Sequence, residues 1–175
     1  MFEVIVGHSN EVTSEEAIAD VLAQCNQQLA RRLNNLSTST SPQAGILLSA
    51  IDFEHSLILA RIQAAFPDIA LIGGTTDGEV SSVMGFQEDS LVLVLFCSDT
   101  IEIKAGLGRG LSKDAIAAAK QSINDLALEP DTLATAKLCV TIPDGLESGT
   151  EVALRQLQQQ QPPNIPIVGG RTGDQ

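Results

Sequence analysis

The chain is poor in aromatic residues and in positive charge. Its 175 residues include no Trp, no Tyr and only five Phe, so its hydrophobic core must be mainly aliphatic. Proteins that bind nucleic acid commonly use aromatic side chains to stack on bases and cations to contact phosphates. Here ten Lys and Arg residues stand against 22 Asp and Glu residues, giving a net charge of -12. This composition disfavours nucleic acid and anionic membranes as partners.

Cysteines and long apolar runs are scarce as well. Cys25, Cys97 and Cys139 are widely spaced and form no CxxC pair, so the sequence predicts no metal site. The longest apolar run, Leu91 to Cys97, is far shorter than the ~20 residues of a membrane helix. Met1 is not followed by the features of a signal peptide. We therefore expect no membrane insertion and take the cytoplasm as the default location.

One tract of the sequence occurs twice. The first tract, residues 69–78, reads IALIGGTTDG, and the second tract, residues 165–174, reads IPIVGGRTGD. Each begins with an apolar run that predicts a strand, which is expected to stop at the Gly pair. Hydroxyl and charged residues follow the glycines in both copies.

The duplication extends beyond these tracts. Ser14–Ala19 matches Ser112–Ala117 at a similar offset, and Asp52 matches Asp144. A period of about 100 residues is too long for a solenoid repeat. The sequence therefore predicts a single domain built from two pseudo-equivalent halves. These halves are residues 1 to about 98 and 99 to 175.

Strands and helices are expected to alternate within each half. Apolar runs predict strands, and residues with a helical period on one face predict helices. The predicted strands are 2–6, 45–51, 69–72, 101–107, 137–142 and 165–168. The predicted helices are 14–33, 54–66, 113–128 (capped by Ser112) and 146–160.

The middle of the chain differs in character. Residues 79–83 and 90–97 are predicted to pair as antiparallel strands around a loop at 87–89. The order is then β-α-β-α-β-β-β followed by β-α-β-α-β, which predicts an α/β fold with mixed sheets. Because the second half lacks a final strand pair, the chain is expected to be a fragment. Its open sheet edge could pair two copies as a homodimer.

The residues around the two Gly pairs are the candidate ligand-binding residues. Backbone N–H groups at such strand ends can bind a carboxylate or phosphate, and an Arg can bind an anion through two N–H groups. An Asp can receive an ammonium group. The two matched Asp residues also follow strands at the end where α/β folds collect ligands. The candidates are Gly73, Gly74, Thr75, Thr76, Asp77, Gly169, Gly170, Arg171, Thr172, Asp174, Asp52 and Asp144.

A purely structural explanation of the same residues stays open. Glycines supply positive φ in tight turns, and Asp and Thr side chains make local turn bonds. The run Gly106-Leu107-Gly108-Arg109-Gly110, expected between a strand and a helix, has the same two interpretations, an anion site or a plain turn. It lacks the spacing of a dinucleotide site and the lysine of a P-loop. No Ser or Cys of known geometry accompanies His8 or His55, so no catalytic residue is assigned. No cofactor is expected.

The residues of the two tracts carry a resemblance to a known family. Ile72 to Glu79, then Asp89 to Leu93, and later Val168 to Asp174 resemble the N-terminal part of the FIST domain. The resemblance covers nearly the whole chain, which is then a truncated FIST N-terminal region. It implies a sensory module of signal-transduction proteins, one that binds small ligands such as amino acids and acts on an output domain. Asp77 and Arg171 depart from the small residues common at their positions in that family.

Together these features predict a non-catalytic sensory module for a small polar ligand. The ligand would bind in one cleft lined by both tracts, and the acidic first tract and basic Arg171 would suit a zwitterion. Two alternatives stay open. One is an enzyme acting on a small phosphorylated or carboxylated substrate through the Gly106–Gly110 run, and the other is a protein-interaction scaffold that uses an open sheet edge.

Overall fold

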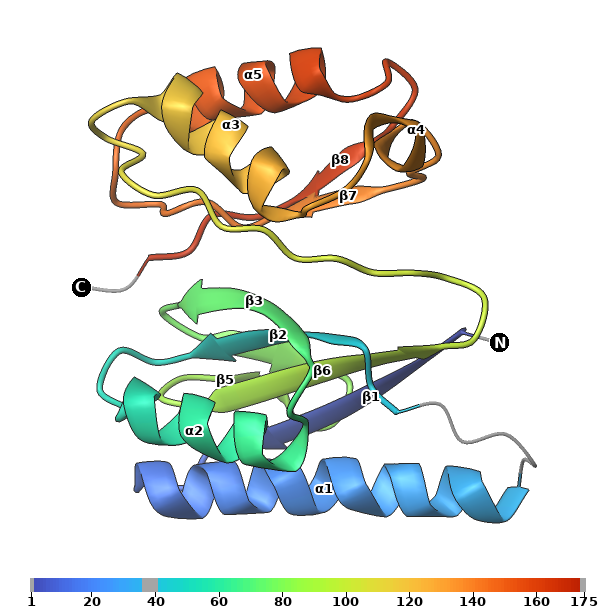
Figure 1. The fold of residues 1–175 in the computed structure, drawn as a ribbon. Helices are drawn as coiled ribbons and strands as arrows, with labels where there is room; N and C mark the ends of the chain where they lie inside the picture. Colours follow the sequence, from blue (N-terminus) through green and yellow to red (C-terminus); the bar gives the residue numbers. More distant parts are fainter. Residues whose placement is uncertain (1, 36–40, 174–175) are drawn as a thin grey trace. The chain divides into compact units, whose positions relative to one another are not determined.

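The computed structural model describes residues 2–35 and 41–173, which form an α/β fold with mixed sheets, as predicted (Figure 1). It divides the chain into two compact units, the first extending through Ile103 and the second comprising Lys104–Gly173. The first unit contains β1 (Phe2–Ser9), α1 (Ser14–Asn35), β2 (Ala44–Ser49), α2 (His55–Ala65), β3 (Ala70–Thr75), β4 (Glu79–Ser81), β5 (Gly85–Gln87) and β6 (Leu91–Ser98). The second contains α3 (Ala115–Asp125), α4 (Pro130–Leu133), β7 (Cys139–Thr141), α5 (Thr150–Gln160) and β8 (Ile167–Gly169).

The first unit is a four-stranded sheet with α1 and α2 packed on one face. The strand order is β1-β6-β2-β3, with β6 antiparallel to both neighbours and β2 parallel to β3. Side chains of α1, α2 and the inner face of β6 form an almost entirely aliphatic core. Its fully buried members include Ile18, Val21, Cys25, Ile58, Ile62, Leu91, Leu93 and Leu95.

The side chain of Thr13 caps the start of α1. The Thr13 hydroxyl accepts a hydrogen bond from the Glu16 backbone N–H at 3.2 Å and donates one to the Glu16 carboxylate at 2.6 Å. These bonds satisfy groups that a helix end leaves open. The Ser14 hydroxyl instead accepts from the Glu54 N–H at 2.8 Å and so ties the start of α1 to the start of α2.

Two glutamines of α1 cover the outer edge of β1. The Gln24 side chain accepts from the His8 N–H at 3.0 Å and donates to the His8 carbonyl at 2.8 Å. Gln28 binds the N–H and carbonyl of Val6 in the same way, at 3.4 and 2.7 Å. Each side-chain amide therefore supplies the two bonds that a neighbouring strand would supply.

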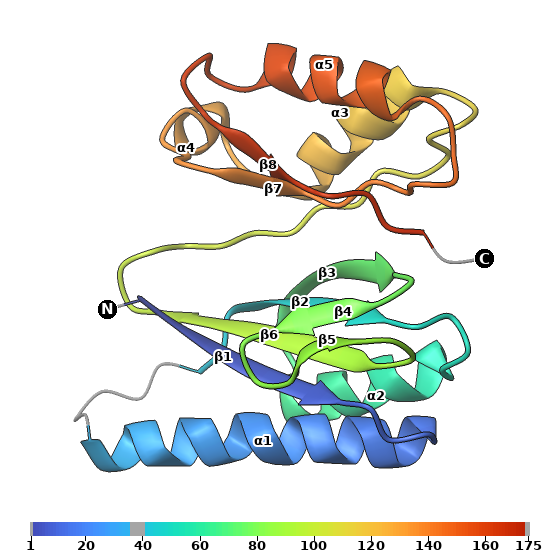
Figure 2. The same ribbon diagram turned by 180° about the vertical axis from the view of Figure 1, so that it is seen from behind.

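The predicted pairing of 79–83 with 90–97 is wrong. Instead β4 pairs with β5 in a short antiparallel hairpin, which packs against β6 (Figure 2). The third strand of this region, β6, enters the main sheet between β1 and β2. Its residues alternate between the two faces of that sheet, and its backbone pairs with all eight residues of β1 on one side and with the six residues of β2 on the other. In this central position the backbone of β6 forms hydrogen bonds along both of its edges, which a two-stranded hairpin would not allow.

The second unit is smaller. Its parallel strands β7 and β8 form a two-stranded sheet, and α3 packs against α5 around Ala119, Ala153 and Leu157. The predicted strand at 101–107 is wrong, because this segment has no strand pairing. The helix predicted from 113 begins at Ala115, and the Asp114 carboxylate rather than Ser112 caps it by accepting from the Ala117 N–H.

Two of the three cysteine thiols are buried in the first unit. Burial, with a smaller contribution from neighbouring Cys97, raises the pKa of the Cys25 thiol to about 12. Cys97 is buried as well, whereas Cys139 is only half-buried. Among helices within 2–35 and 41–173, none combines the length and apolar character that crossing a membrane requires.

Both Gly-Gly pairs begin inside a strand, which corrects the expectation that each strand stops before them. Gly73 of β3 lies opposite Leu47 of β2 with φ of 154°, and Gly169 of β8 lies opposite Thr141 of β7 with φ of 147°. A Cβ at either glycine would overlap the carbonyl oxygen of the residue opposite. The close approach of two backbones therefore requires glycine at both positions.

Replacing Gly169 by alanine should lower the free energy of unfolding by about 2 kcal/mol or more, because the new Cβ meets the Thr141 carbonyl and φ is unfavourable. Gly170→Ala is the matched control, since open space surrounds that position. Its effect should stay within about 0.5 kcal/mol. Urea denaturation followed by circular dichroism measures both, and equal losses in the two variants would contradict the assigned role of Gly169.

Candidate functional site

A cluster of polar side chains is buried beneath the β4–β5 hairpin of the first unit. His8 and Ser90 are 0% exposed, and Glu79 is 1% exposed. Gly7 faces α1, so alternation along β1 places the next side chain, His8, on the sheet face away from the helices. Burying such groups is costly unless their hydrogen bonds are satisfied, so their partners decide what the cluster can do.

The cluster is a continuous chain of hydrogen bonds. The Ser81 hydroxyl lies 2.7 Å from His8 Nδ1, and the Ser90 hydroxyl lies 3.0 Å from His8 Nε2. Ser90 then donates to one oxygen of the Glu79 carboxylate. Thr76 donates to the other oxygen at 2.5 Å. The chain thus joins β1, β4 and the residue before β6 to the first tract.

Donor and acceptor balance assigns the histidine tautomer. Ser81 Oγ accepts from the Val83 N–H at 3.1 Å and the Met84 N–H at 3.3 Å, so its own hydrogen is available for His8 Nδ1. Nε2 then carries the ring hydrogen and donates it to Ser90. Ser90 passes its hydrogen on to Glu79. Every group in the chain is satisfied with His8 neutral.

The electrostatics of His8 agree with this assignment. Burial lowers the pKa of His8 below its ordinary value, and the nearby Glu79 carboxylate opposes part of that shift. Desolvation disfavours the charged imidazolium, whereas an adjacent negative charge favours it. The larger effect is burial, so the neutral ring is the form that the native first unit selects.

Sequence reasoning missed His8, Ser81, Ser90 and Glu79 as a group. The strand containing His8 was predicted to end at residue 6, whereas β1 continues to Ser9. Glu79 and Ser90 both lie in the stretches that carry the family resemblance, which was the available signal. Their contact depends on the hairpin pairing, which was predicted incorrectly.

The first tract lies at the carboxyl ends of β2 and β3. Thr75 is opposite Ser49 in the parallel register, and the Thr76 N–H donates to the Ser49 carbonyl at 3.0 Å. The Thr76 side chain faces Glu79, as its bond shows. Asp52, in the turn after β2, and Asp77 are both exposed. The structure therefore places one hydroxyl of the predicted site in the buried chain and two acidic residues at the surface.

The second tract lies at the carboxyl ends of β7 and β8 in its own unit. Asp144 and Thr172 form an isolated parallel bridge, and the Thr172 N–H donates to the Pro143 carbonyl at 3.0 Å. The Arg171 guanidinium donates through Nη2 to the Gly145 carbonyl. The Asp144 carboxylate accepts from the Leu146 N–H at 2.9 Å. The Asp144–Leu146 bond is a local turn bond, whereas the bonds of Arg171 and Thr172 join the turn after β7 to the end of β8 and bring Asp144, Arg171 and Thr172 together.

Two expectations about the site stay predictions. Asp174 lies outside the described residues. The single cleft lined by both tracts joins residues of different units, so it also stays a prediction. What the structure describes is one candidate region within each unit.

The Gly106–Gly110 run has a packing role. A Cβ at Gly106 or Gly108 would overlap backbone carbonyl oxygens of α3, so glycine allows the segment to lie against that helix. The Leu107 N–H is bound by the Asp125 carboxylate and the Arg109 N–H by the Gln121 side chain, both at 2.9 Å. Because these amides already have acceptors, they do not form the anion site considered above.

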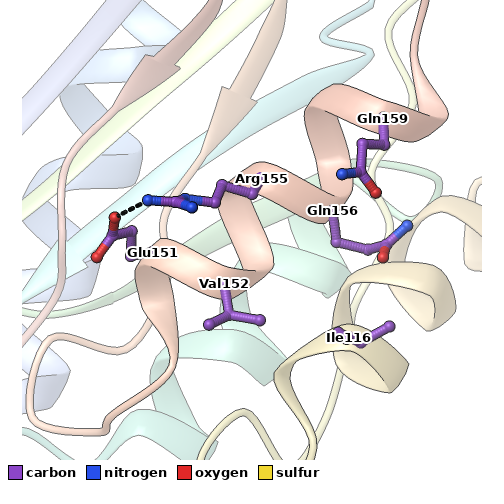
Figure 3. Close-up of a pocket in the computed structure, with 6 residues that line it drawn as sticks. All are labelled: Ile116, Glu151, Val152, Arg155, Gln156 and Gln159. Atoms are coloured by element: carbon purple, nitrogen blue, oxygen red, sulfur yellow. Dashed lines mark hydrogen bonds and ion pairs between the residues drawn. The ribbon is translucent and has the colours of Figure 1, made fainter.

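A shallow groove between α3 and α5 contains none of the predicted site residues. It has a volume of about 440 Å³, with the exposed side chains of Ile116 and Val152 on its walls (Figure 3). Glu151 and Arg155 form an exposed ion pair at 2.6 Å on its rim. Gln156 and Gln159 complete the lining. The described residues include no group of three or more His, Cys, Asp or Glu that could hold a metal ion.

Comparison with protein families places the chain beside known proteins. The family model of the FIST N domain matches residues 43–175, which include both Gly-Gly tracts, Glu79 and Ser90. His8 precedes the matched range. The comparison with curated proteins found no match.

The stability of the first unit should fall as the pH is lowered from 7 to 5. In the unfolded chain His8 titrates near its ordinary pKa of about 6.5. In the folded chain its pKa is lowered, so below 6.5 the unfolded state binds more protons. The contribution of the neutral ring is therefore complete above pH 6.5 and is lost as the pH falls.

Urea denaturation at several pH values measures this loss. His8→Gln should reduce the slope between pH 7 and 5, for which one proton sets a limit of about 1.4 kcal/mol per pH unit. His55→Gln is the control, because His55 lies outside the buried chain and bonds only the Ala50 carbonyl among the described contacts. An unchanged slope in His8→Gln would show that the buried chain does not cause the acid sensitivity.

Proposed function

Because the chain belongs to the FIST N domain family, a family of sensory domains in signal transduction, we propose that it is a non-catalytic cytoplasmic sensory module. It binds a small polar ligand, with amino acids as the first candidates, and passes the signal to an output domain. The proposed ligand contacts are the candidate residues of the two Gly-Gly tracts and of the turns after β2 and β7.

The observation that carries the proposal is the matching geometry of the two tracts. In each unit a parallel strand pair approaches so closely that glycine is required, and polar residues follow at the carboxyl ends of the strands. Ligands of α/β proteins commonly bind at this end of the sheet. Packing explains the glycines. Of the polar residues at these strand ends, Thr76 and Arg171 also make hydrogen bonds within their own units, whereas Asp52 and Asp77 lie exposed.

We further propose that the two units derive from one duplicated segment. In the first unit, Gln24 and Gln28 bind the backbone of β1; in the second, Gln121 and Asp125 bind the Arg109 and Leu107 N–H groups. Both helix positions recur after 97 residues, from 24 to 121 and from 28 to 125. The helix side chains that bind the preceding segment and the glycine required inside a strand occur in both units and support a common origin. A common origin would place ligand contacts at equivalent positions in the two units.

Each tract carries charges that would suit one charged group of a small ligand. Asp52 and Asp77 give the first unit exposed carboxylates, which would attract an ammonium group. Arg171 gives the second unit a guanidinium, and one of its nitrogens, Nη2, is used in turn bonds. A carboxylate can accept two parallel N–H bonds from such a group. Amino acids carry both charges, which is why they lead the candidates.

The test is a thermal-shift screen of the twenty standard amino acids, followed by calorimetry on any that stabilise the chain. A ligand present at a hundred times its Kd should add about 2.7 kcal/mol to the free energy of unfolding. Asp52→Asn and Arg171→Gln should each weaken binding at least about tenfold, which corresponds to ~1.4 kcal/mol.

Asp68→Asn and Arg155→Gln are the matched controls, since both side chains are exposed and lie outside the two tracts. They should leave the affinity unchanged. Stabilisation by none of the twenty would argue against amino acids as the ligand class. Binding that survives both site substitutions would refute the proposed contacts, even if the sensory role itself held.

A further inference from the structure

The three-residue strand β4 is held at both ends by the same histidine. Ser81, its last residue, contacts His8 Nδ1 directly. Glu79, its first residue, is reached from His8 Nε2 through Ser90. Among the described strands, the backbone of β4 pairs with β5 alone, a strand of equal length that does not belong to the main sheet. The position of β4 on the sheet therefore depends strongly on these side-chain bonds.

The first tract runs directly into β4. Thr76 and Glu79 are three residues apart and hydrogen-bonded, so the turn at residues 76–79 closes on the Glu79 carboxylate. Gly78 lies against the ring of Phe86, where a Cβ would be 2.6 Å from Cε2. The turn is thus fixed by Glu79 on one side and by β5 on the other. A shift of β4 must change the turn.

We propose that His8, Ser90 and Glu79 are positioning residues for the first tract, and that uptake of a proton by His8 releases the turn and weakens ligand binding there. The release of the turn follows from the hydrogen-bonded chain. Its effect on a ligand rests on the proposed function.

The chemistry of the release concerns one proton and one hydroxyl. A proton added to His8 goes to Nδ1, which then becomes a donor pointing at Ser81 Oγ. That oxygen already accepts from the Val83 and Met84 N–H groups, and its own hydrogen points at Nδ1. The hydroxyl must turn away, so the bond between His8 and the end of β4 is disrupted unless Ser81 gives up its turn bonds. The imidazolium also attracts the Glu79 carboxylate electrostatically. This attraction competes with the hydrogen bond that Thr76 donates to the same carboxylate.

The groups around His8 make Glu79 its electrostatic partner. From β4, Glu79 acts on the ring by its charge. The end of β4 supplies the uncharged hydroxyl of Ser81, and the residue before β6 supplies that of Ser90. On α1, Gln24 binds the His8 backbone and also donates to the Asp20 carboxylate at 3.0 Å. One buried acid and one buried base therefore face each other across Ser90.

The release can be measured without any ligand. Amide resonances of Gly74, Thr76 and Gly78 are followed by NMR from pH 8 to 5.5, together with the ring resonances of His8 and His55. The tract amides should shift with the midpoint of the His8 ring. They should not follow that of His55. Tract amides that stay constant while His8 titrates, or that follow His55, would overturn the proposal with the wild-type chain alone.

The His8→Gln variant provides an independent test of the same release. In His8→Gln the tract amides should be insensitive to pH over the same range, whereas His55→Gln should behave as the wild type. Should His8→Gln fail to fold, Thr76→Val tests the other end of the chain. It removes the bond to Glu79, so the tract amides should already occupy released positions at pH 8 and should change little on acidification. Persistence of the full wild-type titration in Thr76→Val would count against the proposal.

Ligand binding is tested separately. Each of the twenty amino acids is titrated at pH 7.5 and 5.5 into the wild type and His8→Gln. Binding to the wild type should weaken at least threefold at the lower pH, and binding to His8→Gln should change by less than half of that. If no amino acid binds, the proposed function fails in its amino-acid form while the NMR result still decides the release. If one binds with equal affinity at both pH values, the acid coupling fails and the ligand site stands.

Discussion

The carboxylate of Glu79 is almost fully buried, and the polar half of the first unit is arranged to satisfy it. A buried carboxylate without partners would cost several kcal/mol, so its two oxygens need donors. Thr76 and Ser90 supply them, and Ser90 in turn needs a donor, which is the neutral ring of His8. Ser81 then completes the chain and joins it to the hairpin turn. One acidic residue thus explains why residues from four segments of the chain meet beneath β4 and β5.

The close approach of parallel strands imposes a second constraint, which requires glycine at single positions. Wherever β2 meets β3 and β7 meets β8, one position in the second strand has no room for a Cβ. Glycine there cannot be replaced by a small polar residue, although its neighbour Gly170 is unconstrained by packing. The pair of glycines therefore contains one residue that the strands require in each unit. In the second unit the other is left open for contacts with something outside the strands.

Much of the architecture could be predicted from local sequence, and the failures have physical causes. The helical period of apolar residues predicted the first helix, and the buried face of α1 includes Ile18, Val21 and Cys25. These features depend on residues within a turn or two of each other. Register and pairing do not. Nothing local distinguishes β6 as a partner for β1 from β6 as a partner for β4, because an apolar strand satisfies either.

The candidate site shows the same limit. Gly73 and Gly169 were visible as a repeated pattern, and the turn residues around Arg171 and Asp144 were expected to serve either ligands or local bonds. The buried chain was not visible, because it joins His8 to residues more than 70 positions away through side chains that are common in loops. A histidine two residues past the predicted end of a strand gives little sign of burial. Only the three-dimensional pairing shows that it faces a carboxylate.

The hydrogen bonds from Gln24 and Gln28 to β1 make the two edges of the first sheet unequal as places where another strand could pair. Because Gln24 and Gln28 bind the outward backbone groups of His8 and Val6, a further strand could pair with that part of β1 only by displacing two side-chain amides. At the opposite end β3 is the terminal strand of the sheet, and none of its six residues carries a charge. The edge at β3 is therefore more open to an added strand than the part of β1 that Gln24 and Gln28 bind. Strand β3 also carries the first Gly-Gly pair, so addition of a strand and occupation of the first tract would act on the same few residues.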